Sequence, residues 1–212
     1  MQHPRLNDKG QPVTIHKPST PSATDAWADS GVIATATPDC RMPADINSVP
    51  VATWADAPTD DAGWEALGAR ATFDEPPMPT APGKKPAAGV VTVEPDGRVW
   101  VVAPSNGYGG YTRSYPKGKL DGISTRASAI KEAWEESGLQ VELTGYLCDS
   151  VRTTSLTRYY LARRLGGNPA DMGWESQAVM LVPADTLASI TNHQNDQSIV
   201  KALLARIGKT GA

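Results

Sequence analysis

The sequence predicts an α/β domain preceded by an extended N-terminal arm. Segments with strand-like patterns lie on both sides of a proline-free helical segment, and a second helical segment ends the chain. Prolines recur through residues 1–85, where the apolar runs are too short for an independent core. We therefore expect residues 1–85 to form a proline-rich, partly ordered arm, and residues 86–212 to form the folded domain.

The arm contains three tryptophans, Trp27, Trp54 and Trp64. Each has a large apolar area that is costly to leave in water, so a purely flexible tail would rarely carry all three. We expect the arm to dock on the folded domain or on a second subunit, with residues 1–25 partly loose. A proline-dense connector over residues 73–86 then leads into the domain.

Several segments of the domain have the composition of β-strands. Residues 89–93 and 98–102 are rich in β-branched residues, and the turn signal between them predicts a hairpin. The glycine-rich residues 105–111 predict a loop that either lies beside a ligand or forms a simple surface turn. Further strands are predicted at residues 140–147, 156–162 and 178–182.

The segment from Thr125 to Ser137 predicts a helix, because it lacks proline and glycine and Gly138 can cap its C-terminus. Offsets of three and four place Glu132, Glu135 and Glu136 on one face. An apolar stripe on the opposite face would pack on the core; it consists of Ala127, Ile130 and Trp134. Three neighbouring carboxylates either form a solvated acidic face or bind a cation such as Mg²⁺ or Mn²⁺.

Residues 118–139 resemble the Nudix box, G-x5-E-x7-R-E-U-x-E-E-x-G-U, where U is aliphatic. The second half of the box is matched by Lys131 (in place of arginine), Glu132, Ala133, Glu135, Glu136, Gly138 and Leu139. The first half differs, because Ile123 stands where the family usually has glutamate and the loop after Gly118 is one residue shorter. Such a long spaced match is far more specific than a short glycine motif.

The resemblance implies a Nudix-type α/β/α sandwich with a mixed β-sheet, and a metal-dependent hydrolase. Its metal ligands, for Mg²⁺ or Mn²⁺, would be Glu132, Glu135 and Glu136 with the backbone carbonyl of Gly118. Its catalytic residues would be Glu132, Glu136, Glu175 and Lys131. Lys131 would orient a glutamate by pairing with it, and Glu175, in the loop before the last strand, would bind metal or accept a proton. Asp171 is the alternative to Glu175 in that loop.

Arg113, Lys117 and Lys119 precede the acidic helix and are the predicted substrate-binding residues. A polyphosphate site needs positive groups that offset the charge on phosphoryl oxygens, although each residue alone is as readily a solvated surface charge. The resemblance implies that the substrate is a nucleoside diphosphate linked to another group, or another organic pyrophosphate. ADP-ribose, a nucleotide sugar and a dinucleoside polyphosphate are the examples considered.

A catalytically inactive Nudix module is the alternative, acting as a sensor or scaffold that binds a nucleotide or a protein. Ile123, the shortened loop and the tryptophan-bearing arm favour this alternative. The complete set of Glu132, Glu135 and Glu136 favours the enzyme. The arm and the habit of the family make a homodimer a possible assembly.

The C-terminal part predicts a short helix near residues 183–187 and a final helix capped by Asn195 or Asp196. The final helix has an apolar face made by Ile199, Ala202, Leu203 and Ile207. His193, in the loop between the helices, is interpreted as a surface or capping residue rather than a catalyst.

Charge and composition bound the class of protein. The 20 basic and 23 acidic residues give a net charge of −3, which argues against general nucleic-acid or membrane-surface binding. Cys40 and Cys148 lie far apart and predict two ordinary thiols. The absence of a long apolar run, together with these thiols, leads us to expect a cytoplasmic protein.

Overall fold

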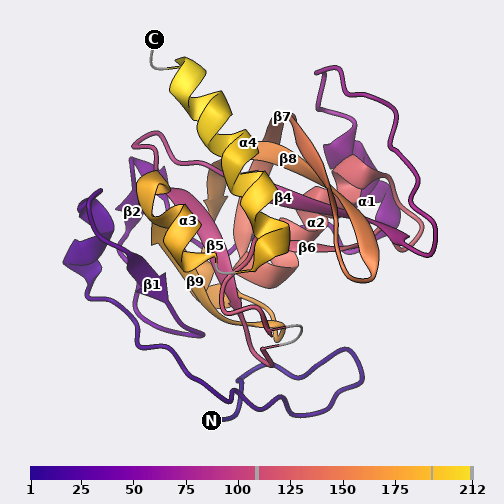
Figure 1. Cartoon of the computed structure of the whole chain (residues 1–212). Helices are drawn as coiled ribbons and strands as arrows, with labels where there is room; N and C mark the ends of the chain where they lie inside the picture. The colour runs from indigo at the N-terminus through magenta and orange to yellow at the C-terminus, as the bar shows by residue number, and fades with distance from the viewer. Residues whose placement is uncertain (108–109, 192, 211–212) are drawn as a thin grey trace.

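The computed structural model describes residues 1–107, 110–191 and 193–210, in which two β-sheets lie between helices (Figure 1). The four-stranded sheet has the order β6 (Lys117–Lys119), β4 (Lys85–Thr92), β8 (Ser155–Gly167) and β7 (Leu139–Val151). Strands β4 and β8 are parallel and the other pairs are antiparallel, so this sheet is mixed. The antiparallel three-stranded sheet has the order β1 (Ala34–Ala36), β9 (Ser176–Val182) and β5 (Val99–Pro104).

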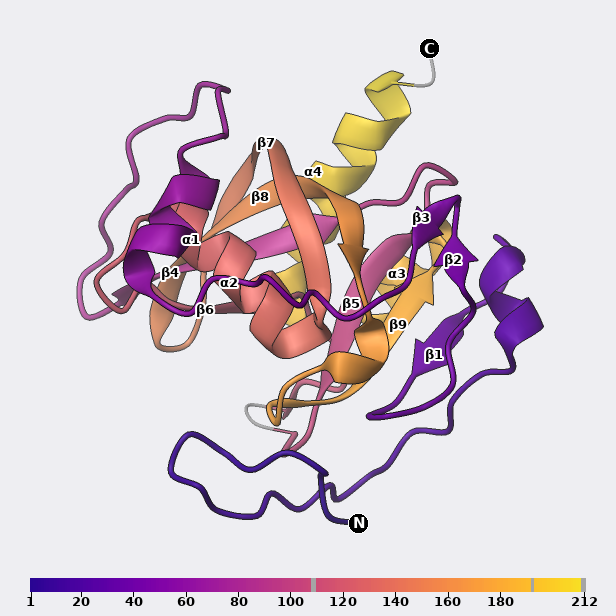
Figure 2. The same cartoon turned by 180° about the vertical axis from the view of Figure 1, so that it is seen from behind.

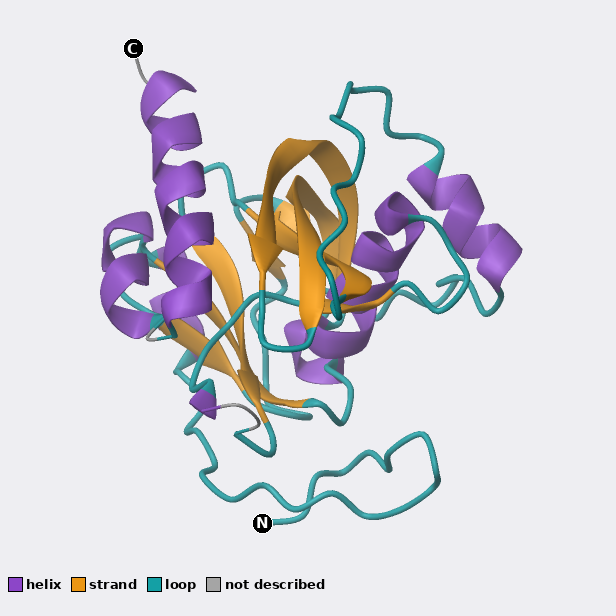
Figure 3. Ribbon diagram, turned by 45° about the vertical axis from the view of Figure 1, so that its right-hand side comes forward, coloured by secondary structure: helices purple, strands orange, loops and turns teal. Residues whose placement is uncertain are grey.

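Helices cover both outer sides of the sheets (Figure 3). Helix α2 (Thr125–Ser137) and α1 (Asp61–Gly68) lie on one side, and α3 (Leu187–Ile190) and α4 (Gln194–Thr210) lie on the other. Each side has its own apolar cluster: one contains the buried residues of α2, and the other contains Leu187, Ile199 and Leu203. The predicted α/β/α sandwich with a mixed sheet is confirmed.

Helix α2 spans the predicted residues because its ends are capped by its own sequence. The Ser124 hydroxyl accepts a hydrogen bond from the amide of Ala127 at 3.2 Å, which satisfies one free donor of the first turn. At the other end Gly138 adopts a left-handed conformation with φ of 68°. Ala127 and Ile130 are buried in the main apolar cluster, so this stripe of α2 fixes the helix on the sheets.

Replacement of Gly138 by Ala is expected to destabilise the fold by at least ~1 kcal/mol, because the positive φ disfavours any β-carbon. The added β-carbon would also collide with the carbonyl oxygen of Asn168. Gly97→Ala is the matched control, since Gly97 has φ of 83° but open space around the β-carbon position. Urea unfolding should show a larger loss for Gly138→Ala; equal losses would show that the collision costs nothing.

The arm packs along the folded domain (Figure 2), and its tryptophans form the contact. Trp27 stacks on Trp100 of β5 with 5.8 Å between ring centroids. Trp64 of α1 contacts Trp134 of α2 at 5.6 Å, and Trp54 meets Trp64 edge-on at 5.9 Å. A short hairpin of β2 (Asp45–Ile46) and β3 (Val49–Pro50) belongs to the same arm. The arm therefore contributes to the main core.

Residues 1–15 form what we call the N-terminal hairpin. The amide of His3 donates to Val13 at 2.8 Å, and the amide of Ile15 donates to Met1 at 2.7 Å. His3 and Ile15 are buried, with exposed fractions of 4% and 1%. His3 and Ile15 thus anchor a segment in which most of the other residues are exposed. That residues 1–25 are partly loose stays a prediction.

The predicted hairpin of residues 89–93 and 98–102 is wrong in its pairing. The turn forms, with the amide of Glu94 donating to the carbonyl of Arg98 at 2.9 Å, but only the bridge Val93–Val99 joins the two segments. Strand β4 already has β6 and β8 on its two edges, so β5 turns away and pairs with β9. The two strands consequently belong to different sheets.

The predicted cap of the final helix is also wrong. Helix α4 already begins at Gln194, so Asn195 and Asp196 lie inside its first turn. The ring of His193 accepts the amide of Asn195 at 3.1 Å, in line with its interpretation as a capping residue. Asp196 is fully buried and forms an ion pair with Arg152 at 2.7 Å.

The two cysteines, Cys40 and Cys148, are free thiols, as the sequence predicts. None of the helices in the described ranges combines the length and the apolar character that are needed to cross a lipid bilayer.

Candidate active site

Four glutamates from two separate segments line one cavity of about 910 Å³. Glu132, Glu135 and Glu136 come from the acidic face of α2, and Glu175 comes from the loop before β9. The structure thus brings together the helix carboxylates and the loop carboxylate that the sequence nominated. The cavity is the largest of those described for the chain.

The loop that carries Glu175 is held by its backbone on both sides. The amide of Gly173 donates to the carbonyl of Glu135, near the end of α2, at 2.7 Å. A β-carbon at Gly173 would collide with that same carbonyl, so glycine permits the close approach. On the other side, the amide of Ser105 donates to the carbonyl of Glu175 at 2.7 Å. These contacts place Glu175 opposite α2.

Gly118 lies in β6 directly against the carboxylate of Glu132. A β-carbon at this position would overlap the carboxylate atoms of Glu132 and would displace that side chain. The neighbouring residues Lys117 and Lys119 line the same cavity as the glutamates. The backbone of β6 therefore lies close to Glu132, and the side chains of Lys117 and Lys119 bring two positive charges to the cavity of the glutamates.

Burial and mutual repulsion raise the pKa of the carboxyls on α2. Glu136 is only 5% exposed, and burial raises its pKa to about 7, with Glu175 and Glu135 adding repulsion and Lys117 opposing the shift. Burial, together with Glu136, Glu135 and Glu175, also raises the pKa of Glu132 well above its ordinary value. Lys131 pairs with Glu135 at 3.6 Å, one helical turn apart. The site thus holds more negative charge than its own lysines offset.

We expect the metal-free protein to lose stability as pH rises from about 4.5 towards 7. In that window the folded Glu136 keeps a proton that the unfolded chain has released, so the folded state binds more protons and raising the pH favours unfolding. One such group changes the free energy of unfolding by at most ~1.4 kcal/mol per pH unit. Urea unfolding in EDTA should show this slope, and it should be smaller in Glu136→Gln. An identical slope in both proteins would contradict the shift.

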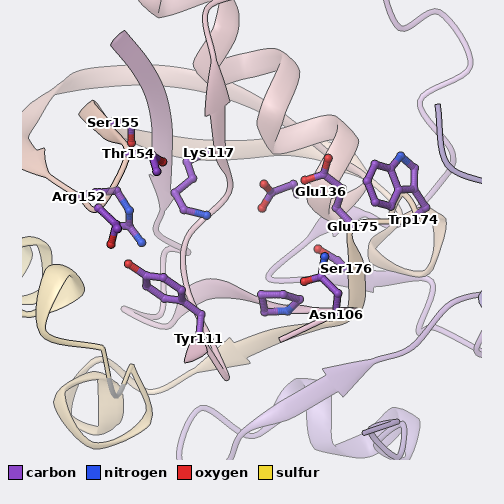
Figure 4. Close-up of a pocket in the computed structure, with 12 residues that line it drawn as sticks. Asn106, Tyr111, Lys117, Glu136, Arg152, Thr154, Ser155, Trp174, Glu175 and Ser176 are labelled. Atoms are coloured by element: carbon purple, nitrogen blue, oxygen red, sulfur yellow. The ribbon is translucent and has the colours of Figure 1, made fainter. Parts of the chain in front are cut away.

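A second cavity of about 480 Å³ adjoins the first, and Lys117, Glu136, Trp174 and Glu175 line both (Figure 4). Lys117 points into this cavity towards Glu136 (Figure 4). The far side of the cavity, away from the glutamates, is built by Tyr111, Arg152, Thr154 and Ser155, whereas Asn106 lies beside Ser176 (Figure 4).

The Arg152 guanidinium in this second cavity is held by three neighbours. It lies over the ring of Tyr111 at 4.8 Å and donates to Tyr159 at 3.0 Å and to Asp196 at 2.7 Å. The Tyr111 ring stacks on His193 with a centroid distance of 4.0 Å. An aromatic ring and a fixed cation therefore face the carboxylates across a continuous space. Within the glycine-rich segment 105–111, residues 108–109 lie outside the described part of the chain.

The remaining predicted residues are placed differently. Asp171 lines the cavity of the glutamates, where its carboxylate accepts from the Thr53 hydroxyl at 2.7 Å. Arg113 lines a separate cavity of about 410 Å³, and its Nε donates to the sulfur of Met180 at 3.0 Å. The structure therefore brings Lys117 and Lys119 to the glutamates, but it does not bring Arg113 there.

The chemistry of this donor set fits a divalent cation. Carboxylate oxygens are hard ligands, and the mutual repulsion that raises their pKa values is what a cation would relieve. Among the residues that the structure describes, no three His, Cys, Asp or Glu side chains stand as a ready-made metal cage. Mg²⁺ in phosphate-handling sites needs only one or two carboxylates, because waters and substrate phosphates complete its shell.

The side chains of the cavity that the sequence did not predict include Arg5, Asp8, Asp121 and Trp174. Arg5 and Asp8 precede the glutamates by more than a hundred residues, and no pattern in the arm connects them with the site. Trp174 precedes Glu175 directly, so it could have been nominated with it.

Glu65 of α1 was missed for the same reason as the arm residues. Its carboxylate accepts hydrogen bonds from the amide and the hydroxyl of Ser124, at 2.6 and 2.7 Å. Ser124 directly follows Ile123, whose side chain is buried in the main core with an exposed fraction of 7%. The Glu65 carboxylate thus binds the N-terminus of α2 next to Ile123, the residue that stands where the Nudix box usually has its first glutamate.

A family model described as the NUDIX domain matches residues 83–203. Among solved structures, the chain is similar to a NUDIX hydrolase from Nitrosomonas europaea, with 14% identity, a TM-score of 0.50, and coverage of 58% of this chain and 90% of that chain. It is also similar to an Ap4A hydrolase from C. elegans, with 21% identity, a TM-score of 0.49, and coverage of 58% and 98%. An ADP-ribose pyrophosphatase from Streptococcus suis has 22% identity, a TM-score of 0.46, and coverage of 57% and 91%. No curated protein matches this sequence.

Proposed function

Because this chain belongs to the Nudix family, we propose that it hydrolyses a pyrophosphate bond in a nucleoside diphosphate linked to another group. The observation that carries the proposal is the convergence of Glu132, Glu135, Glu136 and Glu175 in one cavity that Lys117 also lines. Water adds across the P–O–P bond and two phosphorylated products leave. The reaction needs charge compensation and in-line positioning more than covalent help from the protein.

Glu132, Glu135, Glu136 and the backbone carbonyl of Gly118 would hold the divalent cations, for which we propose Mg²⁺ or Mn²⁺. When bound, these ions supply positive charge to the phosphoryl oxygens and increase the acidity of nearby water. Lys131 keeps Glu135 in place through their ion pair at 3.6 Å. Lys119 lines the same cavity, where its charge adds to attraction for phosphate.

Glu175 or Glu136 accepts the proton of the attacking water. Glu175 is exposed at the cavity, so water reaches it directly. Burial raises the pKa of Glu136 to about 7 in the metal-free protein, so it is a stronger base than an ordinary carboxylate when it is not coordinated to a cation. Lys117 is close enough to Glu136 to oppose that shift, and its amino group points towards Glu136 (Figure 4). A phosphate placed there would lie between Lys117 and the glutamates.

The group attached to the diphosphate would occupy the second cavity, beside Tyr111 and Arg152. Arg113 would contact a part of the substrate that lies farther from the glutamates. The cavity that Arg113 lines shares Asn106 and Tyr111 with the second cavity. This arrangement suits a substrate that extends from the glutamates past Tyr111.

Product analysis with ADP-ribose, diadenosine tetraphosphate and a UDP-sugar tests the proposal. Each substrate should be offered in EDTA, in Mg²⁺ and in Mn²⁺, and the phosphorylated products should be separated by ion exchange. Cleavage of at least one substrate that depends on the added cation is expected. If none of the three is cleaved under any condition, the hydrolase assignment is wrong for these substrates and the alternative is favoured.

An inactive Nudix module that binds a nucleotide or a protein remains the second candidate, and Ile123 is the observation that favours it. Its burial in the core leaves no carboxylate at that position of the box. Nucleotide binding that neither needs a cation nor leads to cleavage would select this function.

A further inference from the structure

The N-terminal hairpin lies outside the segment that the family model matches, yet it is hydrogen-bonded to the loop that carries Glu175. The imidazole Nε2 of His3 donates to the carbonyl of Ser176 at 3.0 Å, one residue after Glu175. Arg5 forms an ion pair with Asp39 at 3.2 Å, which ties the hairpin to a second part of the arm. Because His3 is almost fully buried, the hairpin has one defined place at the edge of the cavity.

Asp8 of this hairpin forms a hydrogen bond with the Trp174 side chain. The indole N–H of Trp174 donates to the Asp8 carboxylate at 3.0 Å. The backbone of Trp174 is fixed separately, since its carbonyl accepts from the Ser105 hydroxyl at 2.8 Å. The hydrogen bond to Asp8 therefore acts on the ring, whereas the hydrogen bond from Ser105 acts on the backbone.

Trp174 stands where the two cavities meet, beside Glu175 (Figure 4). It is only partly buried, although an indole ring is costly to leave in water. Asp8 also adds a negative charge to a cavity that already holds four glutamates. A role towards a ligand would account for both features.

We propose that the N-terminal hairpin is a wall of the active site, in which Asp8 positions Trp174 to stack on the base of the nucleotide substrate. Every base has a flat face, and stacking on an aromatic side chain contributes about 1–3 kcal/mol per base. Asp8 is then a positioning residue that acts through Trp174. The inference rests on the proposed function, and it restricts the substrate to pyrophosphates that carry an aromatic base.

The indole N–H signals in a proton–nitrogen NMR spectrum of the full-length protein test the contact. The chain has six tryptophans, and Trp174→Phe assigns the relevant signal by its disappearance. Asp8→Ala should move this signal and leave the other five in place. Asp8→Asn should keep it near its original position, because an amide oxygen still accepts the hydrogen bond. An unmoved signal in Asp8→Ala would overturn the inference.

Titration with AMP, which has a base and a phosphate, tests whether Trp174 stacks on the base. AMP should shift the Trp174 signal, whereas ribose 5-phosphate, which lacks the base, should not. The Kd for AMP should rise about tenfold in Asp8→Ala and less than about threefold in Asp8→Asn. Lys9→Ala is the matched control, because Lys9 is exposed in the same hairpin and should leave the Kd unchanged. Equal weakening by Asp8→Asn and Asp8→Ala would overturn positioning, as would a wild-type Trp174 signal that AMP does not shift.

Turnover provides the separate test of the proposed function. On a cleaved substrate, Asp8→Ala should raise KM about tenfold and change kcat less than about twofold, because it weakens base binding and not the chemical step. A fall in kcat with unchanged KM would overturn the inference. The wild-type protein could fail to cleave any substrate while AMP still shifts the Trp174 signal in the predicted way. In that case the hydrolase assignment is wrong, and the inference that Trp174 stacks on the base is retained.

Discussion

Glu136→Gln is expected to lower kcat for pyrophosphate cleavage by ~10³-fold. The carboxylate is almost fully buried at the junction of the two cavities, where it faces Lys117 and lies near Glu132, Glu135 and Glu175. Glutamine has the same shape but neither the charge that holds a cation nor the basicity that takes a proton from water. The substitution should therefore abolish the chemistry without disturbing α2.

Two measurements make this expectation specific. Glu142→Gln is the matched control for kcat, because Glu142 lies in β7 and pairs with Arg163 away from the cavity. It should leave kcat unchanged. Thermal melting in EDTA at pH 8 should also show Glu136→Gln to be at least as stable as the wild type, because it removes a buried, repelled charge. Wild-type turnover in Glu136→Gln would contradict the assignment of the site.

Glu94→Gln is expected to destabilise the fold by about 3–5 kcal/mol, the largest stability effect we predict. Glu94 and Arg164 form an ion pair at 2.6 Å in which neither side chain is exposed to solvent. The Glu94 carboxylate also accepts from the Trp100 indole at 2.7 Å and from Asn47 at 3.0 Å. Loss of the charge leaves the Arg164 guanidinium buried without its counter-ion.

The neighbouring ion pair gives the control for Glu94. Arg163 precedes Arg164 in β8 and pairs with Glu142 of β7, but both side chains are exposed. Glu142→Gln should therefore change the free energy of unfolding by less than ~1 kcal/mol. Replacing both Glu94 and Arg164 by Met should cost less than Glu94→Gln alone, since no buried charge remains. Urea unfolding measures all three variants. A loss below 1 kcal/mol for Glu94→Gln would show that water reaches the pair.

This cluster also explains how the arm is bound to the domain. Arg164 donates to the carbonyl of Ile46 at 2.7 Å, and Asn47 donates to Glu94, so the turn between β2 and β3 is part of the same network. The arm therefore contributes hydrogen-bond partners to a buried charge as well as apolar area. For this reason we expect Glu94→Gln to loosen the arm first.

The parts of the fold that depend on local sequence were predicted well. Helix α2 was predicted at its observed bounds because its signals are local: a run without proline or glycine, an apolar stripe, and Gly138 as the C-terminal cap. The three glutamates of its outer face follow from the helical period alone. Glu175 was nominated through the family resemblance, and the structure places it in the cavity with the glutamates of α2.

The parts that depend on contacts between distant segments were not predictable. The pairing of β5 with β9 rather than β4 is decided by which strand edges are already occupied, and the sequence near the turn does not encode this. Asp196 looked like a helix cap, but its partner Arg152 is 44 residues away. The contacts of Asp8 with Trp174 and of Glu65 with Ser124 join the arm to the site over still longer separations.

Crystals of the wild-type protein grown with Mn²⁺ test whether the glutamates of α2 bind a divalent cation. We expect an anomalous difference peak in the large cavity, within about 2.5 Å of carboxylate oxygens of Glu132, Glu135 or Glu136. The peak should be absent from crystals of Glu136→Gln grown in the same solution. A strong manganese peak elsewhere on the protein, with no peak at the α2 glutamates, would contradict this metal site.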